Sequence, residues 1–278
     1  MKASRRAKSF PQPHGGFVKP SSFECIQLDD DKTLNPGENV SPIIAGLVVD
    51  YMTRLIMGAE RKDAFRVSLR GAGRAEDIFG YKGAVEKAVN CVMGIFWHDH
   101  KSLVNACKLV TFDDWYRNPH NASKTAFDEV NPNEETTENL KIMINRSLAF
   151  FDKYGPITAS GFTFEPEDVP EDGLDRTDSI QKGIYGGYTQ IIDSGDGDFL
   201  TKDTLWDFKV SKNLPDSKQT LQLLIYYLMG KHSGQEKYKD ISKLGIFNPR
   251  LNNVYLLDVS NITEETIRTV EKDVIGYQ

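Results

Sequence analysis

The chain has 278 residues, of which 39% are hydrophobic and 27% are charged, and this length suits one large domain or two small ones with a sizeable core. The formal net charge of −6 argues against a generally basic nucleic-acid-binding protein, although metal ions and a local basic groove can neutralise phosphates. No apolar run is long enough to span a membrane, and no apolar segment follows the basic N-terminal residues, as it would in a secretory signal. The three cysteines fit a reducing compartment. We therefore expect a cytoplasmic protein with no membrane partner.

The composition changes along the chain and predicts three regions. Residues 1–40 are rich in proline, glycine, serine and charged residues, which predicts an irregular N-terminal arm. Residues 41–155 carry mainly helical patterns and are expected to form a helical region packed on the core. Residues 156–278 contain most of the strand-like runs and are expected to form an α/β core.

The first strong helix signal covers residues 41–58, where Ser41 is a suitable N-cap and Pro42 suits the first turn. Its apolar sequence predicts burial. Asp50 stands in the middle of this helix, and a buried carboxylate needs a partner. Arg54 follows four residues later, so a structural ion pair is one interpretation.

Three arginines recur four residues apart after this helix: Arg66, Arg70 and Arg74. If the segment is helical they form one basic stripe, although Gly71 and Gly73 make the end of that helix doubtful. Such a stripe is typical of a track for the DNA backbone. A solvated charged face is at least an equally strong alternative.

The remaining helices and strands are predicted from the same hydrophobic patterns. Helical patterns cover residues 76–118, 134–153 and 263–274. Strand-like runs cover residues 157–164, 183–193, 244–247 and 254–259. Glu165 directly follows the first of these runs and begins an acidic loop.

A β-hairpin is predicted with Lys202-Asp203 as its turn, because short strand-like runs stand on both sides of it. In that register Leu200 pairs with Leu205, and Asp198 lies opposite Asp207. Directly opposed residues have β-carbons roughly 5 Å apart, so the two carboxylates are expected to lie close together.

Side chains alternate faces along a strand, so Lys209 shares a face with Asp207. Opposed carboxylates repel, and a divalent cation would compensate them. Mg²⁺ takes oxygen ligands, typically one or two protein carboxylates together with water and substrate phosphate. Lys209 would help to deprotonate a metal-bound water or stabilise charge on a phosphate. The alternative is a solvated hairpin whose charges face water.

A helix is expected after the hairpin. Asp216 is a plausible N-cap, and Gln219 stands three residues further on, as in a capping box. Gln222 and Tyr226 are four residues apart and therefore share one face of this helix. The simpler interpretation is that Tyr226 belongs to the core and Gln222 to the surface.

Taken together, Asp198, Asp207-x-Lys209 and Gln222-x-x-x-Tyr226 resemble the PD-(D/E)XK nuclease superfamily, and within it the RecB-like branch. The resemblance covers residues 195–226. It implies that Asp198 and Asp207 bind Mg²⁺ or Mn²⁺ and that Lys209 assists the attacking water. It also implies that Gln222 and Tyr226 position the metal site or the DNA backbone.

The RecB-like branch also has a glycine followed four residues later by a histidine that points at the metal. Here Gly46 is followed by Asp50, so the resemblance makes Asp50 a third metal ligand, in competition with its pairing to Arg54. Glu165 is the next candidate. Iron–sulphur members of the superfamily use four cysteines, mostly C-terminal to the core, whereas this chain has only Cys25, Cys91 and Cys107. No iron–sulphur cluster is therefore expected.

The resemblance implies an α/β, restriction-endonuclease-like fold: a mixed β-sheet core over residues 156–278, flanked by helices, with a helical N-terminal half. The implied function is metal-dependent hydrolysis of DNA phosphodiester bonds, and the motifs leave exonuclease and endonuclease activity both open. The alternative is a nuclease-derived DNA-binding or scaffold protein without activity.

Overall fold

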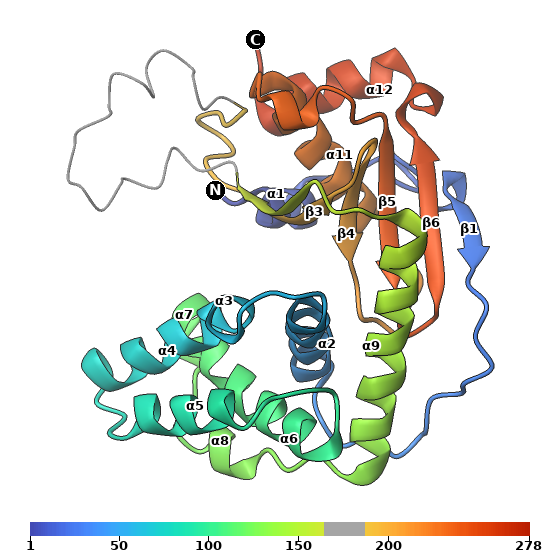
Figure 1. The fold of residues 1–278 in the computed structure, drawn as a ribbon. Coiled ribbons are helices and arrows are strands. Elements are labelled where there is room, and N and C mark those ends of the chain that lie inside the picture. The colour runs from blue at the N-terminus through green and yellow to red at the C-terminus, as the bar shows by residue number, and fades with distance from the viewer. Residues whose placement is uncertain (164–186) are drawn as a thin grey trace.

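The computed structural model describes residues 1–163 and 187–278. Figure 1 shows a helical half, a half that contains the β-sheet, and one long helix, α9 (Glu134–Tyr154), that runs beside both. The helical half contains α2 (Pro42–Ile56), α3 (Arg61–Ala64), α4 (Arg66–Asp77), α5 (Ala84–Met93), α6 (His100–Leu109), α7 (Asp113–Arg117) and α8 (Ala126–Glu129). The predicted helical N-terminal half is thus confirmed.

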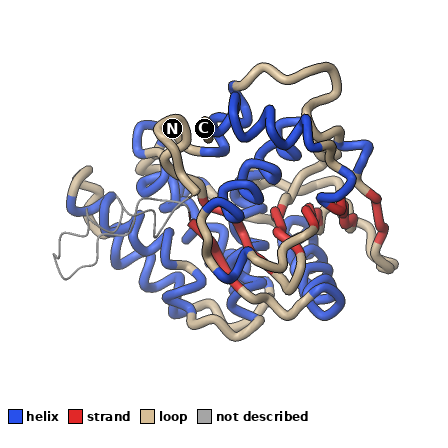
Figure 2. The backbone as a smooth tube through the Cα atoms, turned by 90° about the horizontal axis from the view of Figure 1, so that it is seen from above, coloured by secondary structure: helices blue, strands red, loops and turns tan. Residues whose placement is uncertain are grey.

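The sheet has six strands in the order β1-β6-β5-β4-β3-β2. Their bounds are β1 (Glu24–Gln27), β2 (Ala159–Thr163), β3 (Asp196–Leu200), β4 (Thr204–Phe208), β5 (Lys243–Asn248) and β6 (Asn253–Asp258). Strands β4 and β5 pair in parallel and all other neighbours pair antiparallel. The predicted mixed sheet is therefore confirmed, and Figure 2 shows the row of strands with helices on both sides.

Each face of the sheet is covered by helices that bury its apolar residues. On one face, Leu205 belongs to a core with residues of α11 (Ser217–His232) and α1 (Ala3–Ser9). On the other face, Phe150 of α9 stacks on Phe247 with ring centroids 4.1 Å apart and meets Trp206 edge-on at 4.8 Å. Because side chains alternate along β4, Leu205 and Trp206 point to opposite faces.

The helical half has a separate apolar core that surrounds α2. Helix α4 packs closely on the segment before α7, and Gly71 permits this contact, since a β-carbon at this position would lie 1.9 Å from the carbonyl oxygen of Phe112. Tertiary packing thus overrides the low helix propensity of glycine. The doubt that Gly71 and Gly73 raised about the end of this helix is resolved, because α4 continues through both residues to Asp77.

The prediction of an irregular arm over residues 1–40 is wrong in two places. Helix α1 packs on α11, and strand β1 pairs with β6 at the edge of the sheet, with Cys25 opposite Tyr255. Of the strand predicted over residues 183–193, the described part 187–193 forms no strand.

The C-terminal helix prediction is confirmed. It consists of α12 (Glu264–Thr269) and a π-helical turn (Val270–Ile275) that continues it. Among residues 1–163 and 187–278, none of the helices combines the length and the apolar character that crossing a bilayer requires.

Candidate metal-binding site

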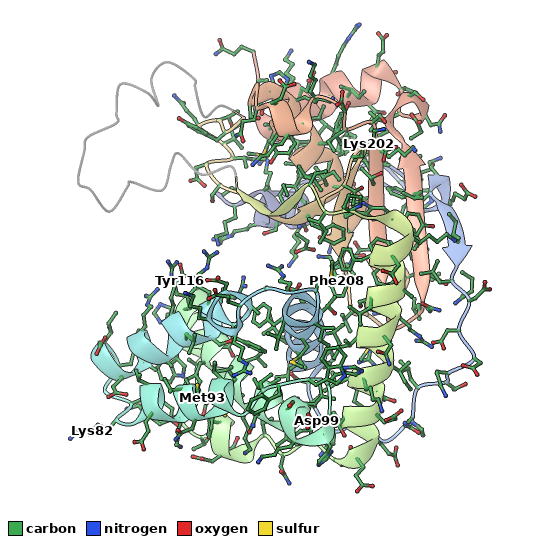
Figure 3. The ribbon with its side chains drawn as sticks, in the orientation of Figure 1. Lys82, Met93, Asp99, Tyr116, Lys202 and Phe208 are labelled. Carbon is green, nitrogen blue, oxygen red and sulfur yellow. The ribbon has the colours of Figure 1, made fainter. Side chains whose placement is uncertain are left out.

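The β3–β4 hairpin has the predicted register. Leu200 pairs with Leu205, and the Thr201 N–H donates to the Thr204 carbonyl oxygen at 3.0 Å, which closes the two-residue turn. In Figure 3 the turn residue Lys202 lies at the end of the hairpin remote from the helical half, whereas Phe208 lies beside that half. The open end of the hairpin therefore meets the helical half.

Asp198 joins the two strands at this open end. The strand pairing stops at Phe199 and Trp206, and beyond it the Phe208 N–H donates to Asp198 Oδ2 at 2.6 Å. This hydrogen bond holds the Asp198 carboxylate beside β4. It was not foreseen from the sequence, because no sequence pattern marks a backbone donor.

Asp207 is buried, with only 3% of its surface exposed. Its Oδ1 accepts a hydrogen bond from Lys209 Nζ at 2.9 Å. Its Oδ2 is buried, and no described residue donates a hydrogen bond to it. A buried charged oxygen without a donor is costly, so this atom has the environment of a ligand for a cation.

The charges around Asp207 act in opposite directions. Burial raises the pKa of Asp207 to about 6, the Lys209 ammonium opposes this rise, and the neighbouring Asp198 carboxylate adds to it. The strand register and the hydrogen bond from the Phe208 N–H place the Asp198 carboxylate beside Asp207, in agreement with the predicted proximity. A bound cation would favour the ionised form of both.

Asp50 lies on α2 and forms the ion pair with Arg54 that was one of its two predicted roles. Arg54 Nε and Nη2 donate to the two oxygens of Asp50 at 2.8 and 3.0 Å. Burial raises the pKa of Asp50, Arg54 opposes this, and Asp198 adds to it, so Asp50 lies within the electrostatic reach of the hairpin. Asp50 is therefore both paired to Arg54 and close to Asp198.

A cleft of about 510 Å³ lies between α2, the short helices after it and the open end of the hairpin. Its lining includes Asp50, Arg54, Arg66, Asp198 and Phe208. Asp207 does not line it. Asp198 therefore borders both the cleft and the buried Asp207, and a ligand in the cleft meets Asp198 and Asp50 first.

Gln222 and Tyr226 lie on one face of α11, as predicted, and Gln222 Nε2 donates to the Tyr226 hydroxyl at 3.0 Å. The predicted capping box of this helix is also present, with Asp216 as its N-cap. Tyr226 is only 1% exposed and shares its core with Leu205, so it is also a core residue. Helix α11 thus covers the sheet face on which Leu205 and Asp207 lie.

The described residues supply a pair of carboxylates rather than a complete metal shell. Within them, no three histidine, cysteine or acidic side chains come together as a group that could hold a metal ion. Glu165 lies outside the described residues. Asp198 and Asp207 alone nevertheless fit Mg²⁺, which commonly uses one or two carboxylates and completes its shell with water and phosphate oxygens.

Comparison with models of known protein families, with characterised proteins and with solved structures finds no match for this chain. The interpretation of the site therefore depends on its own geometry.

Proposed function

We propose that this protein is a metal-dependent nuclease that hydrolyses phosphodiester bonds in DNA, with a restriction-endonuclease-like core of the RecB-like PD-(D/E)XK type. The observation that carries the proposal is the environment of the two carboxylate oxygens of Asp207. Its Oδ2 is buried without a described donor, next to Asp198, while its Oδ1 contacts Lys209. A carboxylate pair with an adjacent ammonium and one buried oxygen that lacks a described donor suits a divalent cation that acts on phosphate.

In this proposal Asp198 and Asp207 hold Mg²⁺ or Mn²⁺, and Asp50 lies close enough to influence the ion. The bound ion supplies a Lewis acid for the phosphate and a water of lowered pKa. Lys209 keeps its ammonium beside the carboxylate pair, where it can take part in proton transfer or balance negative charge on the phosphate.

The remaining residues of the motif act through position. The Phe208 N–H fixes the Asp198 carboxylate, and Arg54 fixes Asp50 by its two hydrogen bonds. Gln222 and Tyr226 contact each other on α11, which packs over the hairpin. Rigid support of this kind is what orients metal ligands.

One observation favours a second candidate, a nuclease-derived DNA-binding or scaffold protein without activity. Asp50 is already neutralised by the two-pronged contact with Arg54, which leaves two carboxylates, Asp198 and Asp207, for a metal among the described site residues. Such a protein would bind DNA but leave it intact when Mg²⁺ or Mn²⁺ is added.

The deciding experiment incubates the protein with labelled linear and circular, single- and double-stranded DNA, with Mg²⁺, with Mn²⁺ and with EDTA. The proposal predicts cleavage of at least one substrate in metal only, and its loss in Asp207→Asn. Binding of DNA without cleavage in either metal favours the second candidate. Loss of linear DNA alone identifies an exonuclease, and nicking of circular DNA identifies an endonuclease.

A further inference from the structure

Helix α4 presents a row of arginines that leads out of the cleft. The arginine row consists of Arg66, Arg70 and Arg74, and Arg66 also lines the cleft. Residues four apart lie on one side of a helix, and the axial rise between them is roughly 6 Å. This spacing is similar to that of successive phosphates along an extended strand.

The arginine row has no carboxylate partner in the part of the chain that the structure describes, and Arg74 donates only to the Tyr116 carbonyl oxygen, at 3.4 Å. Among residues 1–163 and 187–278, none of its three guanidinium groups forms an ion pair. Like charges four residues apart destabilise a helix. A row of this kind on a protein of net charge −6 therefore suits a polyanion that passes along it.

The opposite side of α4 is anchored to the helix that carries Asp50. Ser68 donates to Asp113 Oδ1, and Tyr51 of α2 donates to Asp113 Oδ2 at 2.6 Å. Gly71 allows close contact with the backbone at Phe112. These contacts fix the arginine row relative to α2, and therefore relative to the cleft.

An exposed aromatic ring stands beside the row. The Arg74 guanidinium lies over the ring of Tyr116, 5.6 Å from its centroid, and Tyr116 is 37% exposed. In Figure 3, Tyr116 lies on the side of the helical half that faces the sheet-containing half, and Phe208 of β4 lies at the same border. An exposed ring beside cationic groups is a stacking platform for an unpaired base, whereas bases in a duplex are already stacked.

We propose that the arginine row and Tyr116 bind single-stranded DNA and lead it into the cleft at Arg66. This inference rests on the proposed nuclease function and specifies its substrate. The row binds successive phosphates, Tyr116 stacks with a base, and the strand reaches Asp198 at the cleft. A duplex can use the arginines but not the ring.

The test measures equilibrium binding of a labelled single strand, a duplex of the same length and a single strand with abasic sites. EDTA is present throughout, so that no cleavage occurs. The variants are Arg66→Gln/Arg70→Gln, Tyr116→Ala and Tyr116→Phe. The matched control is Arg268→Gln/Lys272→Gln, which removes the same charge from exposed positions at the C-terminal helix.

The proposal predicts that the wild type binds the single strand more tightly than the duplex. The double arginine variant should lose at least about tenfold in affinity for the single strand, and its salt dependence should fall by about 1.4 in log–log slope. Tyr116→Ala should lose about 5- to 150-fold on the normal strand and almost nothing on the abasic strand. Tyr116→Phe and the matched control should bind like the wild type.

Equal losses in the arginine variant and the matched control would overturn the proposal, as would tighter binding of duplex or an unchanged affinity in Tyr116→Ala. Thermal melting of each variant confirms that it is folded. The assay is independent of hydrolysis. Row-dependent binding without any cleavage in metal leaves this inference standing and refutes the nuclease. Cleavage of DNA without row-dependent binding refutes this inference and leaves the proposed nuclease function standing.

Discussion

The substitution Asp207→Asn should stabilise the metal-free protein at neutral pH. The pKa of Asp207 rises from the ordinary 3.8 to about 6, chiefly because the carboxyl is buried. At about 1.4 kcal/mol per pH unit, the ionised carboxylate is about 3 kcal/mol less favourable in the folded protein than in the unfolded chain. Only 3% of this residue is exposed, so solvent screens the effect little.

The direction of the pKa change determines whether the substitution raises or lowers the free energy of unfolding. A carboxyl whose pKa is raised by folding contributes stability that is complete below pH 3.8 and is lost as the pH rises through about 6. Asparagine removes the penalty at pH 7.5 but weakens the charge-assisted contact of Lys209 with this side chain. We therefore expect the free energy of unfolding to rise by about 1 to 2 kcal/mol at pH 7.5 and to change much less at pH 4.5.

Urea unfolding in EDTA at both pH values measures this difference. The matched control is Asp203→Asn at the turn of the same hairpin. The hydrogen bond from Lys243 lowers the pKa of Asp203, so this substitution should destabilise the protein at pH 7.5. If Asp207→Asn destabilises the metal-free protein at pH 7.5 by more than about 1 kcal/mol, Asp207 is a satisfied ion-pair partner of Lys209, and its Oδ2 does not have the environment of a metal ligand.

Four further substitutions separate chemistry, positioning and packing. Lys209→Ala should lower the rate of single-turnover cleavage about 10²-fold or more with little change in DNA affinity. Gln222→Ala should lower the same rate by a smaller factor. If Lys209→Ala weakens DNA binding in proportion to the rate, Lys209 is a phosphate anchor instead. Asp50→Asn should weaken Mn²⁺ binding measured by calorimetry. An unchanged Mn²⁺ affinity would show that Asp50 is not a metal ligand and that its role is the ion pair with Arg54. Gly71→Ala should lower the melting temperature by several degrees, because its β-carbon would meet a carbonyl oxygen at 1.9 Å, and a melting temperature equal to that of the wild type would show that α4 can shift freely.

The local parts of the site could be predicted from the sequence because short-range rules determine them. Alternation along the strands and a two-residue turn specify the pairing of Leu200 with Leu205. A spacing of four residues places Gln222 beside Tyr226 on α11. The same spacing anticipated the contact of Arg54 with Asp50.

The long-range parts could not be predicted in this way. Strand β1 has only four residues, and its place is decided by the free edge of β6 rather than by its own pattern. The helicity of α4 across Gly71 depends on a backbone contact with a segment some forty residues away in sequence, which no local propensity contains. The cleft depends on how α2 meets the open end of the hairpin, and this is a property of tertiary packing.

The central claim is that Asp198 and Asp207 hold the metal ion that cleaves DNA, and one titration tests it most directly. The cleavage rate of labelled single-stranded DNA is measured across a range of Mn²⁺ concentrations, and Mn²⁺ binding is measured on the same samples. The account predicts that rate and binding rise together with one half-saturation concentration, and that both are lost in Asp207→Asn and retained in Asp203→Asn. Cleavage in EDTA, or full turnover by Asp207→Asn, would contradict it.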